Sequence, residues 1–208
     1  MSWLEITLPI RSGMLRWPGD PEVKVTRTSD ISRGEVCNVS HISMGTHTGT
    51  HIDPPLHFFE DGKSMDTWPL ELGIGPARVI HIKNPECINA DELRKHAPKT
   101  GERILFRTRN SDVGFDEEFR KDFVYVAADA AQLLADSKVA LVGIDYMSIG
   151  GFYMDGEETH RILLGAGIWV IENLNLASIT AGNYELLCLP LRIDNGDGAP
   201  CRALLRPL

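Results

Sequence analysis

Short runs of apolar and β-branched residues, separated by turn-forming residues, dominate the first half of the chain. Runs of this length and composition are typical of short β-strands. We expect strands over residues 4–8, 23–28, 38–44 and 77–82. The prolines and glycines between these runs indicate many short elements joined by tight turns.

The second half of the chain alternates helical and strand patterns. Asn89 can cap a helix over residues 89–97, because Glu92 follows it at the capping-box spacing and Pro98 ends the pattern. A strand–helix–strand passage is expected next, and after it a helix closed by Gly165, a strand, and a strand pair around the turn at 195–198. The expected ranges are 123–126, 128–136 and 139–144 for the passage, 157–164 and 168–172 for the next helix and strand, and 184–193 and 201–205 for the pair. The pattern as a whole predicts a strand-heavy α/β fold.

The length and composition of the chain predict one compact domain, spanning residues 1–208. A hydrophobic content of 43% over 208 residues is ample for one packed core. The formal net charge of −8, without a cluster of Lys or Arg, argues against a nucleic-acid partner. The chain start lacks the pattern of a signal peptide, and the most apolar later run, 162–171, is too short to span a bilayer. We therefore expect a cytoplasmic protein that is not associated with a membrane.

Metal-ligand chemistry is concentrated between residues 47 and 57. This segment contains His47, His51, Asp53 and His57, with Gly49 and two prolines among them. Glycine, β-branched threonines and prolines are poor helix formers, so an extended backbone is expected. Side chains alternate along a strand, and the odd-numbered residues from 47 to 53 should therefore face the same way. Two imidazoles and one carboxylate on one face predict a catalytic metal site with an open position.

His57 follows the two prolines, which should turn the chain away from the ligand face. We therefore expect His57 to stand near the metal and to carry a proton, a task for which an imidazole is suited because its pKa lies near neutrality. The alternative for any single histidine is an ordinary surface or core position. Four ligand-type side chains within eleven residues make that alternative improbable for the whole group.

A second pair of ligand-type residues lies further along the chain. His160 falls on the expected helix, where it can equally be a surface residue. Glu172 ends the apolar run Ile-Trp-Val-Ile-Glu, and a carboxylate buried there would need a partner. If both face the same pocket, a second metal ion becomes feasible.

The segment between residues 47 and 57 resembles the signature of the cyclase-like metal hydrolases, a family that includes the bacterial kynurenine formamidases. The signature His-x-Gly-Thr-His-x-Asp-x-Pro-x-His is present in full. The resemblance extends to Trp-Pro-Gly-Asp at residues 17–20, to the spacing from His160 to Glu172, and to the closing Tyr-Glu-Leu-Leu-Cys-Leu-Pro-Leu-Arg-Ile at residues 184–193.

The resemblance implies a role for each matching residue. His47, His51 and Asp53 would bind a first zinc ion, and Asp53 and Glu172 would bridge it to a second that His160 also binds. His57 would be the proton donor and acceptor, and Trp17 would line the pocket against an aromatic substrate. The implied fold is a compact swivelling β/β/α domain. Members form homodimers or larger homo-oligomers.

The loop after Asp145 departs from the formamidase pattern. Formamidases tend to carry Pro-Ser and then Asp-Pro there, whereas this chain reads Tyr-Met-Ser-Ile-Gly-Gly-Phe over residues 146–152. The resemblance therefore supports hydrolysis of N-formylkynurenine, and it leaves a cyclic amide such as isatin, or a lactone, as an alternative substrate. A non-catalytic metal-binding or ligand-binding module is the alternative outside catalysis. His and carboxylate ligands suit zinc and also manganese.

Overall fold

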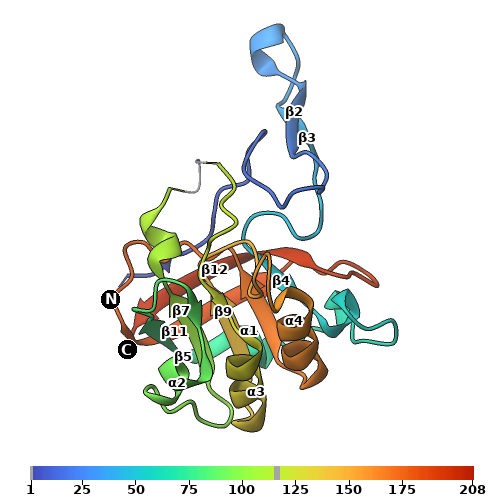
Figure 1. The fold of residues 1–208 in the computed structure, drawn as a ribbon. Coiled ribbons are helices and arrows are strands. Elements are labelled where there is room, and N and C mark those ends of the chain that lie inside the picture. The colour runs from blue at the N-terminus through green and yellow to red at the C-terminus, as the bar shows by residue number, and fades with distance from the viewer. Residues whose placement is uncertain (1, 115–117) are drawn as a thin grey trace.

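The computed structural model describes residues 2–114 and 118–208, and its central feature is a β-sheet that closes on itself (Figure 1). The strands hydrogen-bond in the order β1-β12-β11-β5-β7-β9-β10-β4, and β4 pairs again with β12. The pairs β5–β7, β7–β9 and β9–β10 are parallel, and the other pairs are antiparallel. The strands are β1 (Leu4–Glu5), β4 (His51–Asp53), β5 (Ile74–His81), β7 (Arg103–Arg107), β9 (Leu141–Ile144), β10 (Trp169–Glu172), β11 (Gly182–Pro190) and β12 (Ala199–Pro207).

The alternation of side chains along the strands divides the core into an inner and an outer part. Ile52, Trp169 and Ile171 belong to the apolar cluster enclosed by the sheet. Their neighbour Val170 belongs to a second cluster, between the sheet and the helices. A strand buried on both faces in this way reads as a continuous apolar run, which explains the sequence of β10.

Helices cover the outer face of the parallel strands. Figure 1 shows α3 and α4 side by side over this face. The helices are α1 (Leu70–Gly73), α2 (Ala90–Arg94), α3 (Ala128–Asp136) and α4 (Gly156–Gly165), with 3-10 turns η1 (Ile31–Arg33), η2 (Pro55–His57), η3 (Met65–Thr67) and η4 (Arg109–Asp112). The predicted α/β class is confirmed, α3 has the predicted bounds, and Asn89 caps α2 by accepting from Glu92 N at 2.9 Å. No helix within the described residues is long and apolar enough to cross a membrane.

Two predicted strands are shorter than expected because side chains replace backbone partners. β1 ends at Glu5, and beyond it the Thr7 hydroxyl both donates to Ala203 O and accepts from Ala203 N. The Asn110 side chain similarly donates to Val124 O and accepts from Val124 N, both at 2.8 Å. The strand predicted over 123–126 therefore shrinks to β8 (Tyr125–Val126), which pairs with β6 (Cys87–Ile88) in a separate small sheet. The strand–helix–strand passage thus does not lie within one sheet.

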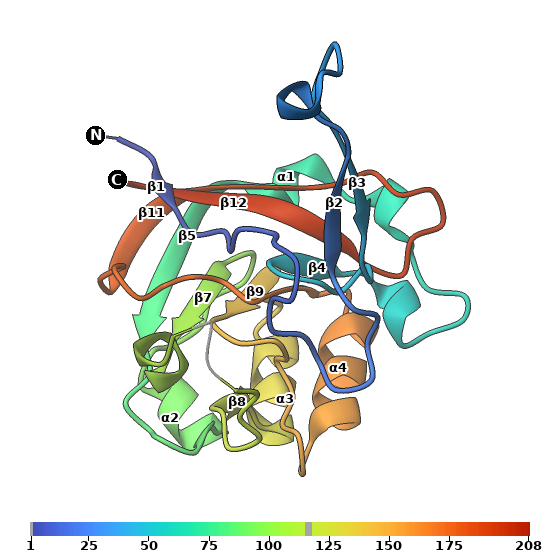
Figure 2. The same cartoon turned by 90° about the horizontal axis from the view of Figure 1, so that it is seen from above.

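A two-stranded hairpin projects from the body of the molecule (Figures 1 and 2). Its strands, β2 (Lys24–Ser29) and β3 (Val39–Ser43), match the predicted strands at 23–28 and 38–44 to within one residue. Val25 pairs directly with Ile42, yet both side chains are exposed. The hairpin joins the segment that contains Trp17 to the segment that contains His47.

Candidate metal centre

Strands β4 and β10 present three ligand-type side chains on the outer face of the sheet. They pair antiparallel, with His51 opposite Glu172 and Asp53 opposite Val170. Because Ile52 points into the enclosed core, its neighbours His51 and Asp53 point the opposite way, toward α4. All three polar side chains are almost completely buried.

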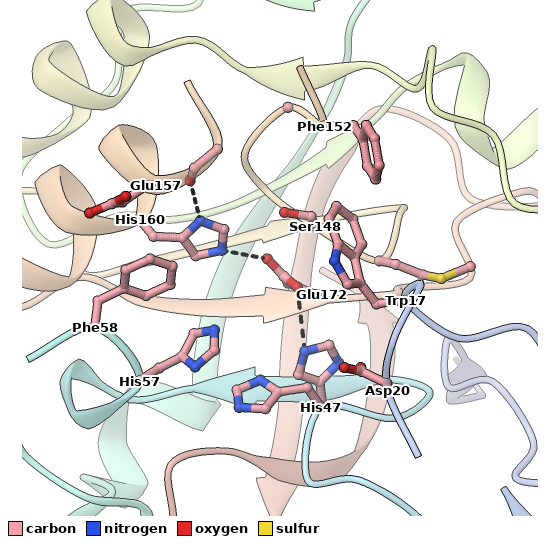
Figure 3. A pocket seen from close by; sticks show the side chains of 14 residues that line it. Trp17, Asp20, His47, His57, Phe58, Ser148, Phe152, Glu157, His160 and Glu172 are labelled. Atoms are coloured by element: carbon pink, nitrogen blue, oxygen red, sulfur yellow. Dashed lines mark hydrogen bonds and ion pairs between the residues drawn. The ribbon is translucent and has the colours of Figure 1, made fainter. Parts of the chain in front are cut away.

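Helix α4 places His160 over these strands. His160 Nε2 lies 3.2 Å from Glu172 Oε1 and 3.7 Å from Asp53 Oδ2. The other ring nitrogen, Nδ1, contacts Gly156 O at 2.6 Å, and the Phe58 ring stacks on the imidazole at 4.7 Å. These two contacts fix the ring so that Nε2 points at the carboxylates (Figure 3).

His47 reaches the same place by a turn, so the extended strand predicted over residues 47–53 is wrong for its first part. Only His51–Asp53 form a strand, and Gly49 has a left-handed φ of +64° that breaks the alternation. The turn brings His47 Nδ1 to 2.8 Å from Asp53 Oδ1. Gly198 makes room for the ring, since a Cβ there would lie 2.6 Å from His47 Cε1.

His57 lies near the ligand cluster. It ends η2, which begins at Pro55, and its ring centroid is 4.0 Å from that of His47. The ligand atoms of His47, Asp53 and His57 lie within 4.8 Å of one another, as do those of His51, Asp53 and Glu172. Asp53 belongs to both groups. The geometry therefore places His57 within reach of a metal as well as of a substrate.

The buried polar atoms of the cluster fit a cation. Asp53 Oδ2, His47 Nε2 and His51 Nε2 are buried and have no hydrogen-bond partner among the described residues. His51 Nε2 lies 3.4 Å from both Asp53 Oδ1 and Glu172 Oε2, without the geometry of a hydrogen bond. Two atoms that each lie about 2.0 Å from a tetrahedral zinc ion are themselves about 3.3 Å apart. The spacing, the unsatisfied atoms and the mixed nitrogen and oxygen donors all suit a divalent metal.

The electrostatics of the cluster also favour positive charge. Burial lowers the pKa of His51, but the attraction of the nearby Asp53 and Glu172 carboxylates outweighs burial and raises this pKa to about 10. Burial raises the pKa of Asp53. The positive charge of His47 and its hydrogen bond to Asp53 outweigh burial and hold this pKa well below its usual range. Without a metal, protons would provide the positive charge that the two carboxylates require.

His57 differs from the other imidazoles of the cluster. Its pKa is lowered, chiefly by burial, and the attraction of Asp53 is opposed by repulsion from His47 and His160. A neutral imidazole at neutral pH can accept a proton, as the predicted role requires.

A cavity of about 380 Å³ opens onto the cluster. Figure 3 shows Phe58 on one side of it, Trp17 and Phe152 on the other, and the imidazoles and Glu172 between them. Trp17 also packs edge-on against Phe119 at 5.2 Å between ring centroids, so it is both anchored and available to the cavity. The size and the aromatic walls suit a small aromatic molecule.

Several wall residues were not identified from the sequence as site residues. They are Asp20, Phe58, Met147, Ser148, Phe152 and Glu157. The loop after Asp145, where the sequence departs from the formamidase pattern, supplies three of them. Asp145 itself is buried and accepts hydrogen bonds from Thr108 and Ser111. Glu172 Oε1 accepts from Ile149 N at 2.6 Å, and this bond ties the loop to the ligand cluster.

Comparison with known proteins identifies the family. The family model described as "Putative cyclase" matches residues 4–150. The chain belongs to the cyclase family. Among curated members, the kynurenine formamidase of Bacillus cereus (strain ATCC 14579) is 36% identical over 99% of this chain and 98% of its own. The cyclase resemblance predicted from the sequence is confirmed.

Solved structures of other proteins share the fold. A potential metal-dependent hydrolase with cyclase activity is 36% identical, with a TM-score of 0.86 over 98% of this chain and 96% of that one. Isatin hydrolase A from Labrenzia aggregata has a TM-score of 0.85 over 98% of this chain and 93% of its own, at 23% identity. At that identity the second comparison establishes the fold alone.

Proposed function

We propose that this cyclase-family protein is a metal-dependent hydrolase of aryl formamides, with N-formylkynurenine as its substrate and kynurenine and formate as its products. The observation that carries the proposal is the convergence of five ligand-type side chains, four of them buried and His47 partly buried, with unsatisfied nitrogen and oxygen atoms at the base of an aromatic cavity. The name of the curated relatives supplies the substrate.

The proposed ligands divide into two overlapping sets. His47, His51 and Asp53 would hold one divalent ion, and His160 would hold the second with Asp53 and Glu172. Both carboxylates lie between imidazoles of the two sets, which supports bridging roles. Two bound ions, which we propose to be zinc, would lower the pKa of water and stabilise the charge that develops on the formyl oxygen. The two carboxylates offset part of their positive charge.

The chain's own residues position the substrate and move the proton. The aryl ring would lie against Trp17, which directs the formamide toward the ligand cluster. His57 would accept the proton of the attacking water and donate it to the aniline nitrogen as the C–N bond breaks. Its lowered pKa keeps the imidazole neutral and ready to accept that proton.

A substrate comparison tests this proposal. Zinc-loaded protein should release formate from N-formylkynurenine with a higher kcat/KM than it shows for opening isatin or a simple lactone. A preference for isatin would instead assign the cyclic-amide activity, and turnover of none of the three would contradict the proposal.

We propose further that the protein forms a homodimer or a larger homo-oligomer through the β2–β3 hairpin. A two-stranded hairpin is at best marginally stable alone in water, and exposed apolar residues usually mark an interaction surface. Val25 and Ile42 form such a pair, and Ile31, Val36 and Val39 add to it with exposures of 57%, 97% and 48%. Most soluble oligomers are closed symmetric assemblies of identical chains. A second copy of this chain is therefore the proposed partner of the hairpin.

A further inference from the structure

Residues 16–20 form a tight turn that places two opposite charges on either side of Trp17. Asp20 N donates to Trp17 O at 3.1 Å, and Gly19 has a φ of +100°. Arg16 Nε donates to Asp20 O at 2.9 Å and so holds the guanidinium beside the turn.

Trp17 is a shared wall between two hollows of the surface. The metal-facing cavity includes the Asp20 side chain, which Figure 3 shows beside Trp17. A second hollow of about 310 Å³ lies next to it and is lined by Arg11, Arg16, Trp17 and Phe119 among others. A molecule whose ring rests on Trp17 can therefore extend a polar chain from the first hollow toward the second.

Neither charge of the turn has a partner that would compete with a ligand. The Asp20 carboxylate makes no hydrogen bond or ion pair within residues 2–114 and 118–208. Arg16 uses only Nε, so its two terminal nitrogens are free among the same residues. Glu157, the other acid at the cavity wall outside the ligand cluster, is instead paired with Arg161 at 2.7 Å.

The cavity that faces the ligand cluster has no Lys or Arg in its described lining. The charged side chains of that lining outside the ligand cluster are the acids Asp20 and Glu157, whereas Arg16 lines the second hollow. The planar end of an arginine binds a carboxylate through two parallel hydrogen bonds. An ammonium group has the opposite preference and would suit Asp20.

We propose that this turn binds the head group of an α-amino acid, with Asp20 contacting its ammonium and Arg16 its carboxylate. The inference rests on the proposed function, because it assigns the part of an aryl formamide that lies outside the reacting centre. It makes Arg16 and Asp20 specificity residues, since formanilide offers the same formamide and ring without the head group.

The test compares N-formylkynurenine with formanilide in the zinc-loaded protein. Arg16→Met and Asp20→Asn should each lower the ratio of the two kcat/KM values by about tenfold, the effect of one exposed charge-assisted hydrogen bond. Arg94→Met, which changes an exposed arginine on α2, is the matched control and should leave the ratio as it is. Thermal unfolding should first show that both turn variants are folded. An unchanged ratio of the two kcat/KM values in both variants would then overturn the inference.

Binding without turnover separates this inference from the proposed reaction. Calorimetry should show that the unaltered protein binds kynurenine more tightly than 2-aminoacetophenone, which has the same ring but no head group, and that Arg16→Met removes the difference. If no formamide is hydrolysed but this preference is present, only the reaction is wrong. Equal affinity for the two ligands would overturn the head-group site whatever the activity.

Discussion

Asp53 is the residue on which the proposed metal centre depends most. It is fully buried, contacts His47, His51 and His160, and belongs to both groups of ligand atoms. Each of the other proposed ligands makes fewer close polar contacts within the cluster. Its carboxylate is therefore the group whose removal should affect both ions together.

Asp53→Ala should abolish metal binding. Without this carboxylate only Glu172 would offset the charge of two divalent ions, and both groups of ligand atoms would lose an oxygen donor. Elemental analysis of the purified variant should find almost no zinc, while the matched variant Asp136→Ala, at the end of α3, should keep the normal content. Retention of two ions by Asp53→Ala would refute the bridging role.

His57→Ala should separate metal binding from proton transfer. If His57 carries the proton, the variant keeps its metal and loses about 100- to 10,000-fold in kcat, the range expected for a removed general acid or base. His96→Ala is a suitable control at a partly buried histidine near the end of α2. Loss of an ion along with activity would instead make His57 a ligand, as its distance from His47 and Asp53 permits.

At the scale of elements, the turn before β4 determines whether the ligands meet. Gly49 combines a left-handed φ with a position where an added Cβ would lie 2.7 Å from Ile10 Cδ1. The Gly49 carbonyl also contacts His51 Nδ1 at 2.9 Å, which orients that ring toward the cluster. The backbone of this turn thus serves both His47 and His51.

Gly49→Ala should weaken zinc binding and stability together. The left-handed conformation alone costs alanine about 1–2 kcal/mol of unfolding free energy, and contact with Ile10 would shift the turn further. Gly101→Ala is the matched control, because Gly101 has a φ of +75° with nothing within 4 Å of an added Cβ. Both variants should lose stability in thermal unfolding, but only Gly49→Ala should raise the Kd for zinc. An equal Kd in the two variants would show that the turn does not position the ligands.

The elements that the sequence predicts well are those with a local signal. Helix α3 and the cap of α2 follow from periodicity and capping chemistry within a few residues. The density of His and Asp between residues 47 and 57 likewise indicates a cluster, and the structure brings His47, Asp53 and His57 together. The turn at Gly49 could not be predicted, because a glycine fits an extended strand and a left-handed turn equally well.

Features that depend on distant partners were beyond the sequence. The Thr7 hydroxyl bonds the backbone of Ala203, nearly 200 residues away, and the backbone of Val124 bonds the side chain of Asn110 in η4. The role of Phe58 at the cavity has no sequence pattern of its own, and it is identified only by the stacking of Phe58 on His160. Asp20 belongs to the family-like Trp-Pro-Gly-Asp segment, but only the fold shows that it lines the cavity.

At the scale of the whole molecule, the hairpin should control assembly. Replacing Val25 and Ile42 with Lys and Glu, as Val25→Lys/Ile42→Glu, removes their apolar surface but keeps a favourable cross-strand pair. Light scattering should show a dimer or larger species for the unaltered protein and a monomer for this variant. Thr26→Lys/His41→Glu makes the same change in the neighbouring pair, which faces the other side of the hairpin, and should keep the assembly.

The two results that would contradict this prediction differ in meaning. A monomeric unaltered protein would rule out the homo-oligomer itself. An oligomer that persists in Val25→Lys/Ile42→Glu would move the interface away from this face of the hairpin.

We propose above that one cluster of side chains holds two metal ions that act together in hydrolysis. Titrating zinc into chelator-treated protein, while following formate release from N-formylkynurenine, tests it most directly. We predict no turnover without zinc and a rise in rate that ends at two zinc ions per chain. A rate that saturates at one ion per chain, or that is the same without zinc, would contradict the claim.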